Sequence, residues 1–176
     1  MRIWLDQVRH EPFDWEETQE VGAERLGRPE VVSLGPVSWL GRVSFVDPAY
    51  LLRARLAYEQ TLTCTRCLKP FAERLAPEAE VLFEIGAPAG AGEHELHGGD
   101  LETVFLEDKI LETDPILLEQ LQLNVPMKPL CRPDCQGLCP RCGADRNLER
   151  CACEERSEEP RWAALAAIRD RLAGDE

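Results

Sequence analysis

The chain has 176 residues, enough for one domain with a hydrophobic core, or for one domain and a small appendage. Its formal net charge is −13, from 20 basic and 33 acidic side chains, so the chain as a whole repels nucleic-acid phosphates. No stretch approaches the roughly 18 consecutive apolar residues of a membrane helix. Charges also interrupt the N-terminal segment where a signal peptide would be apolar. We therefore expect a cytoplasmic protein in a reducing compartment, where disulfides rarely persist.

The first half of the chain predicts an antiparallel sheet. Residues 2–8 form a short candidate strand, and residues 30–46 predict two short strands separated by Gly and Pro turns. Apolar and polar side chains alternate over residues 51–63 and again over residues 71–85, which is the period of a half-buried strand. The two alternating runs flank the turn CTRCLKP, residues 64–70. They therefore predict a hairpin with two cysteines at its tip.

The second half predicts two helices. Residues 101–111 are compatible with one further strand, after which Asp114 and Pro115 suit the N-cap and the first position of a helix. The buried stripe of this helix would be Leu117, Leu118, Leu121 and Val125. A last helix is predicted near residues 158–173. Its apolar face would be Trp162, Leu165, Ile168 and Leu172. The fold class is therefore α+β, with a mainly antiparallel β-sheet, two helices and a cysteine-rich zinc-binding segment.

We expect two domains. Residues 1–125 would form a β-rich domain with the hairpin cysteine turn and one helix. Residues 126–176 would form a metal-binding segment with the C-terminal helix packed on it. Residues 86–100 are a Gly-rich loop that contains His94 and His97. Because such surroundings hold no side chain in place, we do not assign these histidines as ligands.

Eight cysteines indicate structural metal. They are Cys64, Cys67, Cys131, Cys135, Cys139, Cys142, Cys151 and Cys153. Four thiolates complete a tetrahedral zinc site, so eight supply two ions. A disulfide framework is disfavoured in a reducing compartment, whereas an iron–sulfur cluster also takes four cysteines and stays an alternative. The chain contains no nucleophile elbow, phosphate-binding loop or dinucleotide fingerprint, and we assign no catalytic residue.

Two partitions of the cysteines are open. The favoured one closes a local site from Cys139, Cys142, Cys151 and Cys153, and a second site from Cys64, Cys67, Cys131 and Cys135. The rival partition pairs the two CxxC motifs, Cys64-x2-Cys67 and Cys139-x2-Cys142, and leaves the other four cysteines for the second ion. In either case residues 126–153 have little apolar mass. We therefore expect metal to be required for their order.

Charge is distributed unevenly. Basic side chains lie close to the cysteines, at Arg66, Lys69, Lys128, Arg132 and Arg141. They either offset thiolate charge, which we favour, or form a patch that contacts RNA. Residues 86–120 instead carry nine acidic side chains against Lys109 alone. An acidic face of this kind suits the steering of a basic partner.

Several segments together resemble the YceD family. They are the turn CTRCL, the stretch VPMKPLCRPDCQGLCPRCGADRN at residues 125–147, and CAC followed by a helix that opens EPRWAAL. The resemblance covers most of residues 30–172, and CxxxCxGLCPxCG is its most specific part. It implies a role in the accumulation of large-subunit ribosomal RNA, without a molecular mechanism.

Two functional hypotheses follow from the residues and the resemblance. The favoured one is a non-catalytic, zinc-binding factor of large ribosomal subunit biogenesis that acts through protein or ribonucleoprotein contacts. Its partner would be a basic ribosomal protein or the assembling large-subunit particle, with a local RNA contact as the alternative. The second hypothesis is a metal-dependent enzyme that processes or modifies RNA, with one ion as a Lewis acid.

Overall fold

The structure, a computed structural model, describes residues 1–86, 103–153 and 165. The chain divides into two units, Met1–Cys135 and Gln136–Glu176, and each is described by itself. The division expected from the sequence, at residues 125 and 126, stays a prediction. The predicted C-terminal helix lies outside the described residues except for Leu165, and so does the Gly-rich loop with its two histidines.

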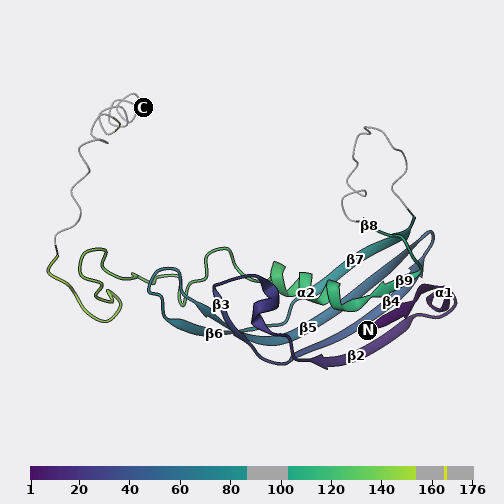
Figure 1. Cartoon of the computed structure of the whole chain (residues 1–176), viewed down its shortest axis with the longest axis horizontal. Helices are drawn as coiled ribbons and strands as arrows, with labels where there is room; N and C mark the ends of the chain where they lie inside the picture. The colour runs from purple at the N-terminus through teal and green to yellow at the C-terminus, as the bar shows by residue number, and fades with distance from the viewer. Residues whose placement is uncertain (87–102, 154–164, 166–176) are drawn as a thin grey trace. The chain divides into compact units, whose positions relative to one another are not determined.

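A seven-stranded sheet dominates the first unit (Figure 1). Its central strand is β5 (Ala49–Thr63), and the others are β2 (Phe13–Gln19), β3 (Val31–Leu34), β4 (Val37–Val46), β6 (Pro70–Leu75), β7 (Glu78–Ile85) and β8 (Thr103–Leu106). β5 pairs antiparallel with β3, β4, β6 and β7. Only the β7–β8 pair among the described strands is parallel. The predicted α+β class with a mainly antiparallel sheet is therefore confirmed.

On each side of β5 a proline divides the neighbouring stretch of chain into two strands. Pro36 separates β3 from β4, and Pro77 separates β6 from β7. Backbone bonds continue across both breaks, because Gly35 donates to the carbonyl of Glu59 and Leu56 donates to the carbonyl of Pro77. The two strands predicted within residues 30–46 are confirmed. The alternating run over residues 71–85 is two strands because proline cannot donate to the ladder.

A second, two-stranded sheet joins β1 (Arg2–Trp4) to β9 (Ile110–Glu112). The strand predicted over residues 2–8 is therefore wrong in its second half, where α1 (Leu5–Val8) forms a helical turn. Its two buried residues, Leu5 and Val8, are three positions apart, a spacing that places them on one side of a helix. The single strand expected over residues 101–111 is also two strands, β8 and β9.

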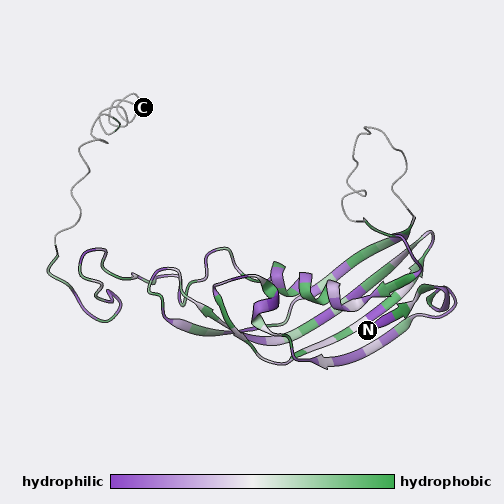
Figure 2. Ribbon diagram, viewed as in Figure 1, coloured by the Kyte–Doolittle hydropathy of each residue, from purple (hydrophilic) through white to green (hydrophobic). Residues whose placement is uncertain are grey.

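One face of the large sheet is covered by α2 (Thr113–Leu123) (Figure 1). Ile116, Leu117 and Leu121 join the sheet residues Trp39 and Leu52 in one buried cluster. Hydrophobic and hydrophilic residues alternate along the strands accordingly (Figure 2). No helix among the described residues is long and apolar enough to cross a membrane.

The first turn of α2 differs from the expectation in one respect. Asp114 was expected to be the N-cap, but the helix already begins at Thr113 and has no side-chain cap bond. The Asp114 carboxylate instead accepts a hydrogen bond of 2.7 Å from the N-terminal ammonium of Met1. That bond lowers the pKa of Asp114. The sequence did not predict this bond, because Met1 lies 113 residues from Asp114 along the chain.

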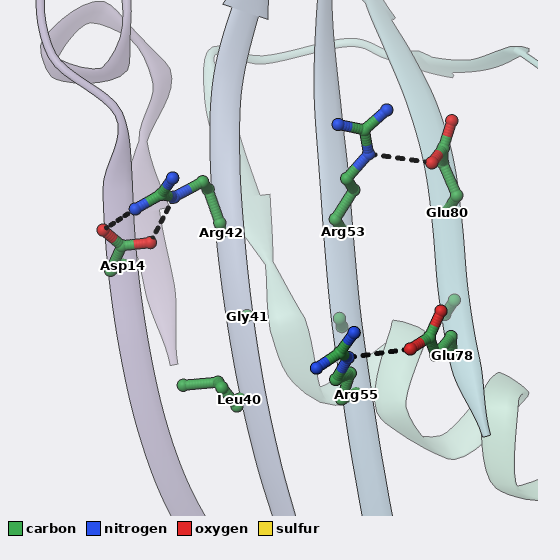
Figure 3. A pocket seen from close by; sticks show the side chains of 10 residues that line it. Asp14, Leu40, Gly41, Arg42, Arg53, Arg55, Glu78 and Glu80 are labelled. Carbon is green, nitrogen blue, oxygen red and sulfur yellow. Dashed lines mark hydrogen bonds and ion pairs between the residues drawn. The ribbon is translucent and has the colours of Figure 1, made fainter. Parts of the chain in front are cut away.

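The opposite face of the sheet carries charged cross-strand pairs (Figure 3). Arg42 donates to both carboxylate oxygens of Asp14, at 2.6 and 2.8 Å. Two further arginines of β5 bind glutamates of β7, as Arg53–Glu80 and Arg55–Glu78 pairs. A shallow groove of about 610 Å³ lies between the Arg42–Asp14 pair and the two arginine–glutamate pairs. Because the pairs are exposed to water, they add little stability, but they favour the observed strand register.

Candidate metal centres

The first cysteine turn is a direct continuation of the buried face of β5. Alternate residues of that face run through Tyr58, Gln60 and Leu62 to Cys64, and all four side chains are buried. The turn then closes on itself. The N–H of Leu68 donates to the Cys64 carbonyl at 2.9 Å, and the N–H of Cys64 donates to the Lys69 carbonyl at 3.0 Å. These bonds hold the two cysteines of the turn close together.

Residues 126–135, which follow α2, run along this hairpin tip. The backbone N–H and the hydroxyl of Thr65 both donate to the Pro129 carbonyl, at 2.9 and 3.1 Å. Arg66 donates from Nη1 to the Cys135 carbonyl at 2.7 Å. The contacts place Cys131 and Cys135 beside the cysteines of the turn.

The four sulfur atoms of this first cluster fit one tetrahedral ion. They belong to Cys64, Cys67, Cys131 and Cys135 and all lie within 4.8 Å of one another. The Cys64–Cys135 and Cys67–Cys131 Sγ distances are 3.8 and 3.7 Å. Zinc bonds of about 2.3 Å would separate tetrahedral thiolates by about 3.8 Å. Phe71 and Leu130 pack against the cluster, so it is continuous with an apolar environment.

The second cluster is built locally in the second unit. Its sulfur atoms, from Cys139, Cys142, Cys151 and Cys153, also lie within 4.8 Å of one another. The N–H of Gly143 donates to the Cys139 carbonyl at 2.9 Å, and the N–H of Cys139 donates to the Ala144 carbonyl at 2.8 Å. Among its cysteines only Cys139 is buried.

The second cluster has its own supporting turn. Asn147 receives a hydrogen bond from the backbone N–H of Gln136 at 2.8 Å through its Oδ1. The backbone N–H of Asn147 donates in turn to Asp145 Oδ1 at 2.9 Å. Arg146 donates through its backbone to the Gly137 carbonyl at 3.0 Å. These polar contacts close the turn. A metal ion bound by all four cysteines would in addition connect residues 139–142 to residues 151–153.

Electrostatics differ sharply between cysteines of the same cluster. Burial opposes the ionisation of Cys64, but hydrogen bonds from the backbone N–H groups of Cys67, Cys131 and Arg66 outweigh it and lower the pKa of Cys64 to about 6. In contrast, burial and the neighbouring thiols, Cys135 first among them, raise the pKa of Cys131 to about 12. Thiolates this close repel one another unless a cation lies between them.

The second cluster shows the same contrast. Hydrogen bonds from the backbone N–H groups of Cys142 and Arg141 lower the pKa of Cys139 to about 6. The thiol of Cys142, followed by burial, raises the pKa of Cys153 to about 12. Each cluster therefore favours one thiolate by backbone dipoles and needs a bound cation before all four sulfurs can ionise.

The structure places every cysteine predicted as a ligand in one of these two clusters, and their membership follows the favoured partition rather than its rival.

The predicted basic contact residues do not all lie in one place along the chain. Arg66 bonds to the Cys135 carbonyl, and Arg132 lies 3.4 Å from Asp134. Lys69 and Lys128 have exposed side chains in the first unit. Arg141 belongs to the second unit, whereas the other four belong to the first.

Two supporting residues were missed from the sequence. Thr65 anchors residues 126–135 through its hydroxyl, and no feature of CTRC indicated this role. Arg146 lies beside the second cluster, where the Cys139 sulfur raises the pKa of the Arg146 guanidinium. A basic residue four positions after CPRC was the available signal for Arg146.

Comparison with known proteins gives a family and several relatives. A family model described as "Large ribosomal RNA subunit accumulation protein YceD" matches residues 52–169. Proteins of Mycobacterium bovis and Mycobacterium tuberculosis, "Uncharacterized protein Mb2951c" and "Uncharacterized protein Rv2926c", are each 31% identical over 127 residues. Those alignments cover 72% of this chain and 59% of each relative, so the chain spans less than two thirds of the mycobacterial proteins.

A Bacillus subtilis protein, "Uncharacterized protein YlbN", is 22% identical over 165 residues, which cover 93% of this chain and 92% of the relative. No solved structure matches the chain.

Proposed function

We propose, starting from the fact that the chain belongs to the YceD family, that it is a non-catalytic factor of large ribosomal subunit biogenesis with two structural zinc ions. It would act in the cytoplasm, through contacts with the assembling particle that allow large-subunit ribosomal RNA to accumulate. The observation that carries the proposal is the pair of clusters with four sulfur atoms within 4.8 Å. A reducing cytoplasm would keep these thiols available for metal.

The donor sets favour a structural role for both ions. A catalytic zinc keeps one coordination position for water or substrate, whereas four thiolates fill a tetrahedral ion. The compact sulfur sets also favour single ions over a multinuclear iron–sulfur cluster, whose inorganic atoms lie between its cysteines. We therefore assign Cys64, Cys67, Cys131, Cys135, Cys139, Cys142, Cys151 and Cys153 as the zinc ligands, one ion per cluster.

The charge of the chain favours a ribonucleoprotein partner with basic protein surface. A net charge of −13 opposes a broad grip on RNA, whose affinity rests on phosphate neutralisation by clustered basic residues. It suits the steering of a basic ribosomal protein, an effect that raises association rates more than affinity. An assembling particle presents such proteins together with RNA, so a small basic surface of this chain could still contact RNA locally.

The test combines metal content, particle association and RNA turnover. We expect two zinc ions per purified chain, sedimentation of the tagged chain with large-subunit precursors, and reduced large-subunit ribosomal RNA in depleted cells. The Cys64→Ser chain should lose one ion and much of its particle association. Cleavage or modification of large-subunit RNA by the purified metal-loaded chain would favour the enzyme hypothesis instead. Absence of the chain from all precursor particles would refute the proposal.

A further inference from the structure

The two cysteine turns share one backbone design but differ at one position. In each turn the residue after the second cysteine donates to the carbonyl of the first cysteine, from Leu68 at 2.9 Å and from Gly143 at 2.9 Å. Both residues have a left-handed backbone, with φ of 59° for Leu68 and 75° for Gly143. Glycine adopts this conformation without steric cost, whereas a branched side chain does so rarely.

Burial of the Leu68 side chain does not offset the conformational cost of a leucine at this position. The side chain of Leu68 is 62% exposed, so the hydrophobic effect contributes little there. Strained residues of this kind persist where the surrounding structure over-determines them, and they concentrate at functional sites. Glycine or asparagine would serve the turn better. Leu68 is therefore explained by what it presents at the tip of the hairpin and not by the turn itself.

The surroundings of Leu68 are apolar and basic. The bonds from Thr65 to the Pro129 carbonyl bring residues 127–131 alongside the turn, and Met127 in that segment is 91% exposed. Residues 64–69 and 126–135 contain four basic side chains, Arg66, Lys69, Lys128 and Arg132, and a single carboxylate, Asp134. A zinc ion with four thiolates adds a net charge of about −2. The tip therefore stays slightly positive in a chain of net charge −13, and an anionic ligand meets little repulsion there.

We propose that this hairpin tip, residues 64–69 with 126–132, contacts an unpaired RNA segment of the assembling large subunit. Leu68 packs on an exposed base, and Lys69 and Lys128 interact with the flanking phosphates. The contact rests on the proposed function and adds to it a location and a ligand class.

Two arguments favour RNA over an acidic protein surface as the occupant. A stable protein interface buries about 800 Å² on each partner, far more than one or two protruding apolar side chains supply. An unstacked base, in contrast, offers an apolar face that a single side chain can cover, and small zinc-stabilised turns are among the known readers of single-stranded RNA. The metal cluster beneath the turn would hold Leu68 in place, which lowers the entropic cost of binding.

The first test distinguishes a role of the Leu68 side chain in RNA binding from a role in folding. Leu68→Asn and Leu68→Gly remove the apolar side chain and also relieve the left-handed strain. In the zinc-loaded full chain we expect both to raise the melting temperature by about 2 °C. We also expect both to weaken binding to large-subunit RNA freed of ribosomal proteins about tenfold, measured by fluorescence anisotropy. Leu68→Met should retain binding. Leu40→Thr, which changes another exposed leucine, is the control and should leave binding unchanged.

Lower stability of Leu68→Asn, or unchanged RNA binding, would overturn the inference. Lys69→Gln and Lys128→Gln should each reduce the slope of log affinity against log salt by about 0.7. An unchanged slope would overturn the phosphate contacts.

The second test identifies the occupant on native particles. A photo-crosslinking residue at position 68 should attach to large-subunit RNA in cells, whereas the same residue at position 40 should not. Attachment to a ribosomal protein, or no attachment, would overturn RNA as the occupant. The outcomes also separate this contact from the proposed function. If the chain sediments with precursors but position 68 does not crosslink to RNA, only the tip contact fails. If the chain never joins precursors, the proposed function fails.

Discussion

The two cysteine clusters use one kind of turn for different structural purposes. Residues 64–69 and 139–144 repeat the same pair of backbone hydrogen bonds and the same lowered pKa of the first cysteine. In the first cluster the other two cysteines come from a segment 64 residues farther along the chain. In the second cluster all four cysteines lie within residues 139–153. The turn is thus a local unit, and its partner segment decides which parts of the chain a bound metal ion would connect.

This difference has energetic consequences. Closing a loop costs entropy that grows with the logarithm of its length, so the first ion would impose the larger constraint on the unfolded chain. The first cluster, however, also rests on Phe71 and Leu130 and on the bonds from Thr65 and Arg66. The second has a single buried cysteine, Cys139. We therefore expect the second cluster to depend on its ion more completely than the first.

Removal of metal should have the largest effect and would test that dependence directly. On strong chelation we expect amide protection to disappear over residues 136–153, to fall over residues 126–135, and to persist in β4 and β5. Structural zinc contributes roughly 10 kcal/mol or more of apparent folding free energy in small domains, whereas the sheet has its own hydrophobic core. Hydrogen exchange measured by mass spectrometry would follow each segment. Unchanged protection of residues 136–153 would contradict the comparison.

Single ligand substitutions should separate the clusters. Cys153→Ser is expected to cost one zinc equivalent and to loosen only the second unit, because its sulfur belongs to the local cluster. Cys135→Ser is expected to cost the other equivalent and to release residues 126–135 from the hairpin. Native mass spectrometry would count the ions, and hydrogen exchange would locate the released segment. Loss of protection at residues 64–69 in the Cys153→Ser chain would show that the clusters exchange ligands.

A substitution in the second turn would measure the cost that the first turn already carries. Gly143 has a left-handed φ of 75°, and apart from its chain neighbours no described residue has an atom within 4 Å of where a Cβ would lie. Gly143→Ala should therefore cost only conformational energy, about 1–2 kcal/mol, which lowers the zinc affinity of the second cluster about 5- to 30-fold. Competition with a chromophoric chelator would measure it. An unchanged affinity would mean that a side chain at the left-handed position costs no free energy, and that Leu68 is not strained either.

Local patterns predicted the parts of the structure that depend on local chemistry. The alternation of residues 51–63 predicted which side chains of β5 face the core, and the spacing of Leu117 and Leu121 predicted the buried side of α2. Short separations between cysteines favoured the partition that the structure adopts. The helical turn at Leu5–Val8 and the bond from Met1 to Asp114 were not predictable in this way. They depend on pairing between the first residues of the chain and residues 109–114, which no local window contains.

The smallest effect expected at neutral pH concerns the sheet alone and would show how much of the first cluster's support is independent of metal. Tyr58 lies on the face of β5 that leads to Cys64, with its side chain only 6% exposed, and its hydroxyl has no hydrogen-bond partner among the described residues. Burial, followed by the negative charge of Glu73, raises the pKa of Tyr58 to about 12. An unfolded tyrosine titrates near 10.

The raised pKa fixes the sign of the pH dependence. The neutral hydroxyl is the form that the folded sheet prefers, so its contribution is fully present below pH 10 and is lost as pH rises from about 10 to 12. The loss amounts to about 2–3 kcal/mol at most. Tyr58→Phe should remove this alkaline dependence and should be neutral or slightly stabilising at pH 7, because it deletes a buried hydroxyl that lacks a partner. Urea unfolding of the metal-free parent and variant, compared at each pH, would isolate the effect, since the cysteines titrate in both. An equal alkaline loss in the two chains would mean that the Tyr58 hydroxyl is hydrated in the folded sheet, and that the inner face of β5 beside the first cluster is open to water.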